Sequence, residues 1–260
     1  WSPDGSLMAS AEPSMEDDGT RTDRINIRRA GEQEVLLQTE PTENMLRLRF
    51  SADGQTVSGC DVRGALRTWS ATTGELLSEI GGGGNDAVPS PDGQRLAVLS
   101  GSSVRLLATE DGNHELEFKG HEYSVTDLSW SPDGRLACST GIQVYQNRSP
   151  EVLIWDTTTG EETMRLRGMD VAIKRVAWSP DGSRIATGSQ DGWIALWDAS
   201  TGDLLLRDRN GSRIDSLVWS PDGQVLVSGS ADGPARVLRA PSQADRAGSQ
   251  RPVEKGPSGD

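Results

Sequence analysis

The sequence predicts an all-β protein built from repeated four-stranded antiparallel units, and three observations support this prediction. A turn sequence, Ser-Pro-Asp-Gly or in one copy Ser-Ala-Asp-Gly, recurs along the chain with its serine at Ser2, Ser51, Ser90, Ser131, Ser179 and Ser220. The copies are about 40 to 50 residues apart, a period that indicates a solenoid or a ring of repeats. A closing tryptophan or leucine also stands at a constant distance after the turn serine, at Trp69, Trp197 and Leu238.

Each element of the repeat follows from its local sequence. The turn joins two strands as a hairpin, because proline presets φ for a type I turn and glycine supplies the positive φ that closes it. Short runs with strand-forming residues flank the turns, such as "RIDSLVW" before Ser220 and "QVLVSGS" after Gly223. A second turn, Asp191-Gly192, leads to "WIALWD", and a third, "ASTG" at 199–202, leads to "DLLLRDR". Four short strands in each period form the blade of a β-propeller.

Several phrases resemble the WD-40 repeat family. They are "VLIWDTTTG", "IALWDASTG" and "LRTWSATTG", together with Gly120-His121, and the resemblance covers about residues 1–240. The repeats are similar to degenerate, bacterial-like members of the family. The resemblance implies a β-propeller whose blades order their strands a, b, c and d outward from a central channel. We therefore expect six b–c units that form part of a seven-bladed ring.

The resemblance also implies structural roles for particular side chains. In this family a histidine of the d–a loop, a serine or threonine of strand b, an aspartate of the b–c turn and a tryptophan of strand c form a hydrogen-bonded set. The fifth unit supplies Thr187, Asp191 and Trp197 but lacks the histidine, and the fourth supplies His121 and Trp155 but has an insertion in place of the aspartate turn. Because no unit holds the whole set, we expect the blades to depend mainly on packing.

The domain boundaries follow from the repeat. We expect one propeller domain over residues 1–240 and a disordered tail over residues 241–260, which are polar and rich in Pro, Gly and Ser. The first unit begins at the end of its strand a and the last stops after strand c, whereas propellers close their ring to remove exposed edges. We therefore expect an N-terminally truncated fragment, whose missing part precedes Trp1.

Composition excludes several kinds of partner. The chain has 39 acidic and 26 basic residues and a formal charge of −13, which disfavours nucleic acid because that binding draws on clustered cations. No run of apolar residues is long enough to insert into a membrane. Cys60 and Cys138 are too few and too far apart for a disulfide framework, so we expect free thiols.

For the location of the protein in the cell, we expect the cytoplasm.

No catalytic, cofactor or metal motif is found in the sequence. The turn aspartates are a blade apart, so no two of them reach one ion, and we interpret them as turn residues. There is no Gly-x-Ser-x-Gly elbow, and the histidines are His114 and His121, of which His121 is interpreted as a structural loop residue. The "GGGG" at 81–84 lacks the Lys-Ser/Thr that follows in a phosphate loop. We expect no enzyme activity, cofactor or metal.

The loops opposite the Ser-Pro-Asp-Gly rim are the candidate binding surface, because rigid scaffolds place binding residues on loops. Two b–c connections on this face are long, the acidic residues 12–23 and residues 141–150. Aromatic and arginine side chains dominate interface energies, and several lie here near strand starts. The candidate residues are Tyr123, Tyr145, Arg148, Met169, Lys174, Trp193 and Arg213, with Glu16, Asp17 and Asp18 of the acidic connection selecting a basic ligand.

The predicted function is a non-catalytic scaffold that recognises a protein or peptide of basic character. Packing of Trp193 against a neighbouring blade is the alternative interpretation of that residue. The alternative function is a regulatory propeller within a larger enzyme, such as a kinase, a protease or a nucleotide-switch protein, with its catalytic part upstream of residue 1. A periplasmic propeller similar to the TolB type is a third possibility. The full-length reading frame would distinguish these, because fold alone does not determine function.

Overall fold

The computed structural model describes residues 2–15, 21–40, 42, 45–51, 53–81, 84–141, 150–169 and 171–239. The regular structure within these ranges is β-strand, arranged as six antiparallel sheets in chain order. In the same ranges no helix is long and apolar enough to cross a membrane. The tail predicted at 241–260 lies outside the described residues.

Four sheets have four strands and the first and last have three. The first sheet contains β1 (Leu7–Met15), β2 (Arg21–Arg29) and β3 (Val35–Gln38). The second contains β4 (Met45–Phe50), β5 (Thr56–Asp61), β6 (Leu66–Ser70) and β7 (Leu76–Ile80). The third contains β8 (Asp86–Pro89), β9 (Arg95–Ser100), β10 (Ser103–Ala108) and β11 (His114–Lys119).

The remaining three sheets follow the same plan. The fourth contains β12 (Val125–Trp130), β13 (Leu136–Gly141), β14 (Val152–Asp156) and β15 (Glu162–Leu166). The fifth contains β16 (Ile173–Trp178), β17 (Arg184–Ser189), β18 (Trp193–Asp198) and β19 (Leu204–Arg209). The last contains β20 (Ser216–Trp219), β21 (Val225–Ser230) and β22 (Gly233–Arg239).

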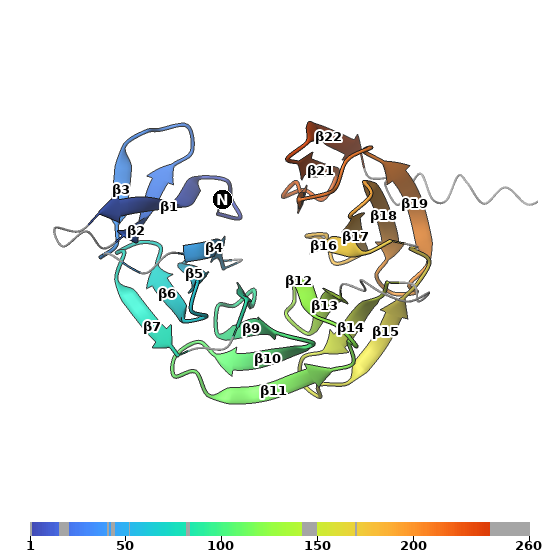
Figure 1. Cartoon of the computed structure of the whole chain (residues 1–260), viewed down its shortest axis with the longest axis horizontal. Coiled ribbons are helices and arrows are strands. Elements are labelled where there is room, and N and C mark those ends of the chain that lie inside the picture. The colour runs from blue at the N-terminus through green and yellow to red at the C-terminus, as the bar shows by residue number, and fades with distance from the viewer. Residues whose placement is uncertain are drawn as a thin grey trace, which may run out of the picture.

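The sheets are arranged as the blades of a β-propeller, which confirms the predicted fold class. Figure 1 shows them placed radially around a common centre, with β4, β12 and β16 on the inside and β7, β11, β15 and β19 on the outside. The first and last sheets lie at the two ends of the arc, and their described strands do not pair with each other. Four of the six sheets have all four strands and two have three, so the described residues do not form the seven-bladed ring that was expected.

The Ser-Pro-Asp-Gly turns are locked by the same contact in every sheet. The serine hydroxyl donates to the aspartate two residues later, as in Ser179 to Asp181 (2.6 Å) and Ser220 to Asp222 (2.5 Å). The glycine that closes the turn has a positive φ, which is 72° at Gly182. The aspartates are therefore turn residues, as the sequence predicted.

The core lies between neighbouring sheets. Between the third and fourth sheets, Leu106 and Phe118 pack with Trp130 and Trp155, and the Phe118 ring stacks on the Trp155 ring with centroids 5.4 Å apart. Cys60 is a buried free thiol, as predicted, and burial raises its pKa to about 11. The side chain of the second cysteine is outside the described set.

The acidic b–c connection of the first sheet differs from the sequence prediction. Residues 12–23 were expected to form a loop, but most of them belong to two long strands, in which Glu12 pairs with Arg24 and Met15 with Arg21. Oppositely charged side chains across the strands stabilise this extension, because Arg28 Nη1 lies 2.6 Å from Glu12 Oε1. Only residues 16–20 remain between the strands, outside the described ranges.

Candidate interaction surfaces

Three of the predicted partner-binding residues lie where consecutive inner strands begin. Tyr123 precedes β12, Lys174 is the second residue of β16, and Arg213 precedes β20. Tyr123 is 37% exposed. The strand starts are tied together, because the Arg175 guanidinium donates to the Asp215 carbonyl (2.6 Å). These side chains therefore share one end of the central channel, opposite the turn rim.

This end of the channel carries a local positive charge. Burial lowers the pKa of Lys174, and the nearby charges of Arg213 and Arg175 lower it further. Arg213 Nε donates to Asp215 Oδ1 at 2.7 Å, and this contact holds the pKa of Asp215 below its usual range. An anionic group on a partner would relieve the repulsion among the three cations.

Trp193 is half-buried and contacts both a core cluster and two arginines. Its ring packs against the core cluster between the fourth and fifth sheets, and the Arg207 and Arg209 guanidinium carbons lie 4.3 and 5.4 Å from its centroid. This placement agrees with the alternative interpretation of Trp193, in which it packs on a neighbouring blade. The two arginines form cation–π contacts that hold the indole in place.

Met169 is a core residue and not a surface residue. Its side chain is 1% exposed and packs with Ile173 and Trp178. The prediction that Met169 binds a partner is therefore wrong, because its side chain is buried between two sheets. The remaining candidates, Glu16, Asp17, Asp18, Tyr145 and Arg148, lie outside the described residues, so their roles stay predictions.

The structural residues that the resemblance implied are placed in part as expected. The Trp197 indole donates to Thr187 Oγ1 at 3.0 Å, and both side chains are buried. Asp191 accepts from Ser189 Oγ (2.6 Å), which closes the b–c turn of the same sheet.

In the fourth sheet the two implied residues meet through their rings. The His121 ring meets the Trp155 ring edge-on with centroids 6.2 Å apart. Burial lowers the pKa of His121 to about 4, so the imidazole is neutral at physiological pH. Both residues therefore contribute to packing in the described structure.

A buried charge cluster on the inner strands was missed by the sequence interpretation. Arg49 Nη2 on β4 lies 3.2 Å from Asp86 Oδ2 on β8 and 3.1 Å from Asp127 Oδ1 on β12. Asp127 Oδ2 also accepts from the Val176 N–H of β16 (3.0 Å). One cluster thus links four consecutive blades. The sequence did contain a signal for this cluster, because charged residues stand within otherwise apolar inner strands.

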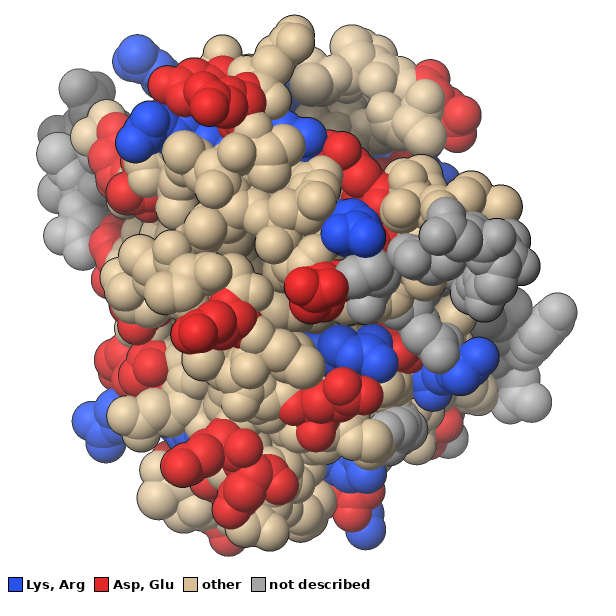
Figure 2. Space-filling model, turned by 90° about the vertical axis from the view of Figure 1, so that its left-hand side faces the viewer, with Lys and Arg blue, Asp and Glu red and all other residues tan. Residues whose placement is uncertain are grey.

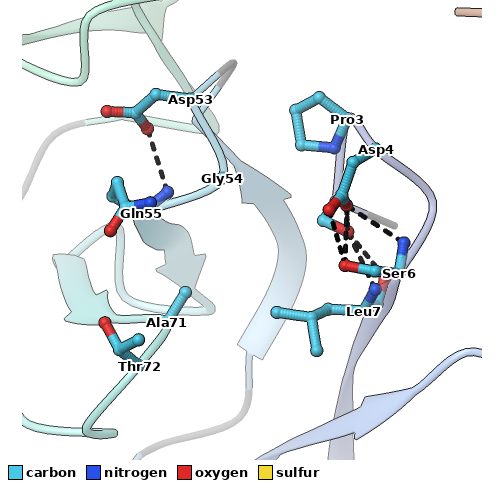
Figure 3. Close-up of a pocket in the computed structure, with 10 residues that line it drawn as sticks. Pro3, Asp4, Ser6, Leu7, Asp53, Gly54, Gln55, Ala71 and Thr72 are labelled. Atoms are coloured by element: carbon cyan, nitrogen blue, oxygen red, sulfur yellow. Dashed lines mark hydrogen bonds between the residues drawn. The ribbon is translucent and has the colours of Figure 1, made fainter.

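A pocket on the opposite rim was also missed. Figure 3 shows it between the turns of the first two sheets, with Pro3, Asp4 and Leu7 on one side and Gly54 and Ala71 on the other. Its volume is about 230 Å³. Figure 2 shows that carboxylates are scattered in several separate groups over one side of the molecule.

Comparison with known proteins agrees with this architecture. The family model described as "WD domain, G-beta repeat" matches residues 112–156, 160–198 and 205–233. No curated protein matches the chain. Among the described residues, no group of three or more His, Cys, Asp or Glu side chains is placed to hold a metal ion.

Proposed function

Because this chain is a WD40-repeat β-propeller, we propose that it is a non-catalytic scaffold that docks a protein partner on the face formed by the b–c and d–a loops. WD40 propellers generally act as protein-interaction scaffolds. The observation that carries the proposal is the placement of Tyr123, Lys174 and Arg213 at the starts of three consecutive inner strands. Side chains held by a rigid sheet lose little further freedom on binding, so they favour recognition.

The partner is proposed to be basic overall. The net charge of −13 attracts a cationic protein over long range and speeds its association. Around Lys174 the local charge is reversed, so a carboxylate of the partner is expected at that place. The acidic residues 16–18 would add to the attraction. We also propose a cytoplasmic location.

A site-specific crosslinking experiment tests the proposal. A photoreactive amino acid is placed at position 123, and a matched control places it at Leu77, which is 53% exposed on the outer strand β7. The proposal expects one protein to crosslink from position 123 and not from position 77. The same crosslink should be lost in a Lys174→Glu, Arg213→Glu variant and weakened by added salt. Equal crosslinking from both positions would refute the docking face.

A further inference from the structure

The pocket between the first two sheets can be compared with the same place in other blades. The residue that begins strand b accepts a hydrogen bond from the turn serine N–H in each sheet, as for Ser2 to Leu7 (2.9 Å) and Ser90 to Arg95 (2.8 Å). This contact fixes the equivalence of six positions without any assumption about sequence similarity. They are Leu7, Thr56, Arg95, Leu136, Arg184 and Val225.

In the third sheet, an arginine at this position reaches across to the next blade. Arg95 Nη2 donates to the Gly134 carbonyl (3.2 Å), and its Nη1 donates to the Thr157 carbonyl (3.1 Å). Its guanidinium lies over the Trp130 ring, 5.4 Å from the centroid. The guanidinium thus fills the space between two consecutive turns.

The fifth sheet repeats the arrangement. Arg184 Nη2 donates to the Gly223 carbonyl (2.8 Å) and lies over the Trp219 ring at 5.0 Å. Between the fourth and fifth sheets the equivalent residue is not an arginine, but the Trp178 indole donates to the Gly182 carbonyl (3.1 Å). At these three junctions the glycine carbonyl of the following turn therefore has a side-chain donor.

The junction between the first and second sheets has no such donor among the described residues. Leu7 stands in the place of the arginine, and no described side chain donates to the Gly54 carbonyl. Ala71 stands in the place of Thr157, because its N–H donates to the Gln55 carbonyl (2.8 Å) as that of Thr157 donates to Arg135 (3.0 Å). Alanine has no hydroxyl, whereas Thr157 Oγ1 donates to the Gly134 carbonyl.

The backbone spacing of this junction matches that of the filled one. A Cβ built on Gly54 would lie 3.7 Å from Pro3 Cδ, and one built on Gly134 would lie 3.5 Å from Pro91 Cδ. The two turns therefore approach each other equally closely. The pocket of about 230 Å³ is the space that an arginine side chain occupies two blades further along.

The pocket also carries negative charge. Asp4 accepts hydrogen bonds from Ser2 and Ser6, and the contact with Ser2 is the main cause of a pKa lowered to about 2. Asp53 accepts from Ser51 Oγ and the Gln55 N–H. In the fifth sheet the equivalent turn carboxylate lies 3.6 Å from the arginine that fills the junction. Within the described part of the chain, neither of these two pocket carboxylates forms an ion pair.

We propose that this pocket binds a guanidinium group, that of an arginine side chain presented by a partner protein. The Gly54 and Ala71 carbonyls accept its two parallel N–H groups, as Gly134 and Thr157 accept those of Arg95, and Asp4 and Asp53 balance its charge. The planar guanidinium presents donors in a fixed fork, whereas the lysine ammonium is a compact point charge. The site lies on the rim opposite the proposed docking face and does not depend on it.

Titration with short peptides tests the proposal on the whole chain. The probe is the capped tripeptide Gly-Arg-Gly, compared with its lysine and citrulline versions and with free L-arginine, and the readout is the shift of the Gly54, Gln55 and Thr72 amide NMR signals. We expect the arginine peptide to bind at least about tenfold more tightly than the other two peptides. Equal binding of the three peptides, or shifts elsewhere only, would overturn the proposal. Free L-arginine binding as tightly as the capped peptide would identify a small guanidinium compound as the source.

A variant that supplies the arginine from within the chain provides the sharper test. In Leu7→Arg the new side chain should fill the pocket and weaken peptide binding at least about tenfold. Val225→Arg makes the same charge change at the equivalent position of the last sheet and should leave binding unchanged. Should Leu7→Arg not fold, Asp4→Asn with Asp53→Asn takes its place, with weaker binding expected. Wild-type affinity in the folded Leu7→Arg chain, or in the folded double variant where that is used, refutes the site.

Discussion

The inner-strand charge cluster predicts an asymmetric response to mutation. A single Arg49 guanidinium faces two carboxylates, those of Asp86 and Asp127, whose side chains are 4% and 5% exposed. In Arg49→Met both buried carboxylates lose their contact with the Arg49 guanidinium. In Asp127→Ala, Arg49 keeps its contact with Asp86 at 3.2 Å. Removal of the cation should therefore destabilise the fold more than removal of one anion.

The magnitude follows from the burial of the groups. Breaking a buried ion pair by removing one partner costs about 3 to 5 kcal/mol. Asp127→Ala belongs at the lower end, about 3 kcal/mol, because Arg49 is 32% exposed and keeps Asp86. That figure includes the Val176 N–H, which loses its acceptor at 3.0 Å. Arg49→Met belongs at the upper end, about 5 kcal/mol.

Urea unfolding monitored by tryptophan fluorescence, at about pH 7 and about pH 5, measures both costs. Burial already raises the pKa of Asp127, and the Arg49 charge opposes that rise. Without Arg49 the folded state binds more protons than the unfolded state in this range, so its stability increases as pH falls. The cost of Arg49→Met, taken against wild type at each pH, should then shrink at the lower pH. A larger cost for Asp127→Ala, or a cost of Arg49→Met that does not change with pH, would refute the reasoning.

Three further predictions concern the blades themselves. Trp197→Phe removes the indole N–H that donates to Thr187 Oγ1 at 3.0 Å. It should lower the free energy of unfolding in urea by about 2 kcal/mol. Adding Thr187→Val to this variant should cost less than Trp197→Phe itself, because the contact is already lost. Gly192→Ala places a Cβ 2.7 Å from a backbone oxygen at φ +89°, so it should cost about 3 kcal/mol or more. The matched change Gly211→Ala, at φ +86° with no atom within 4 Å of the new Cβ, should cost only about 1 to 2 kcal/mol, and equal costs would contradict the steric account. NMR titration should find the pKa of His121 in the folded protein near 4. In the unfolded protein the same imidazole takes up its proton near pH 6.5. His121 should therefore lower the stability of the fold as pH falls from 6.5 to 4.

The repeat, the turns and the blade architecture could be predicted from sequence because their causes are local. Proline and glycine at fixed places in each turn set the backbone angles, and the turn serine and aspartate bond to each other two residues apart. Two buried tryptophans of strand c, Trp69 and Trp197, stand at the same distance after the turn serine. Such signals need no knowledge of what lies in the next blade.

Whether a residue belongs to a candidate surface depends on contacts between blades, and the sequence was less informative about these contacts. Met169 looked like a loop residue but is buried between two sheets, and Trp193 is held by Arg207 and Arg209. The connection at 12–23 looked like a loop because it is polar, yet its charges pair across two strands, as Arg28 and Glu12 do. Burial and pairing of this kind are properties of neighbouring segments and not of a local pattern.

The period, the turn chemistry and the class of fold follow from the sequence alone, because each repeat encodes its own hairpins. The contacts between repeats depend on how the blades pack. Arg49 meets two aspartates from two other blades, and Leu7 leaves open a space that Arg95 fills elsewhere. The physical reason is distance along the chain. Residues about 40 positions apart in sequence become neighbours only when the blades pack side by side.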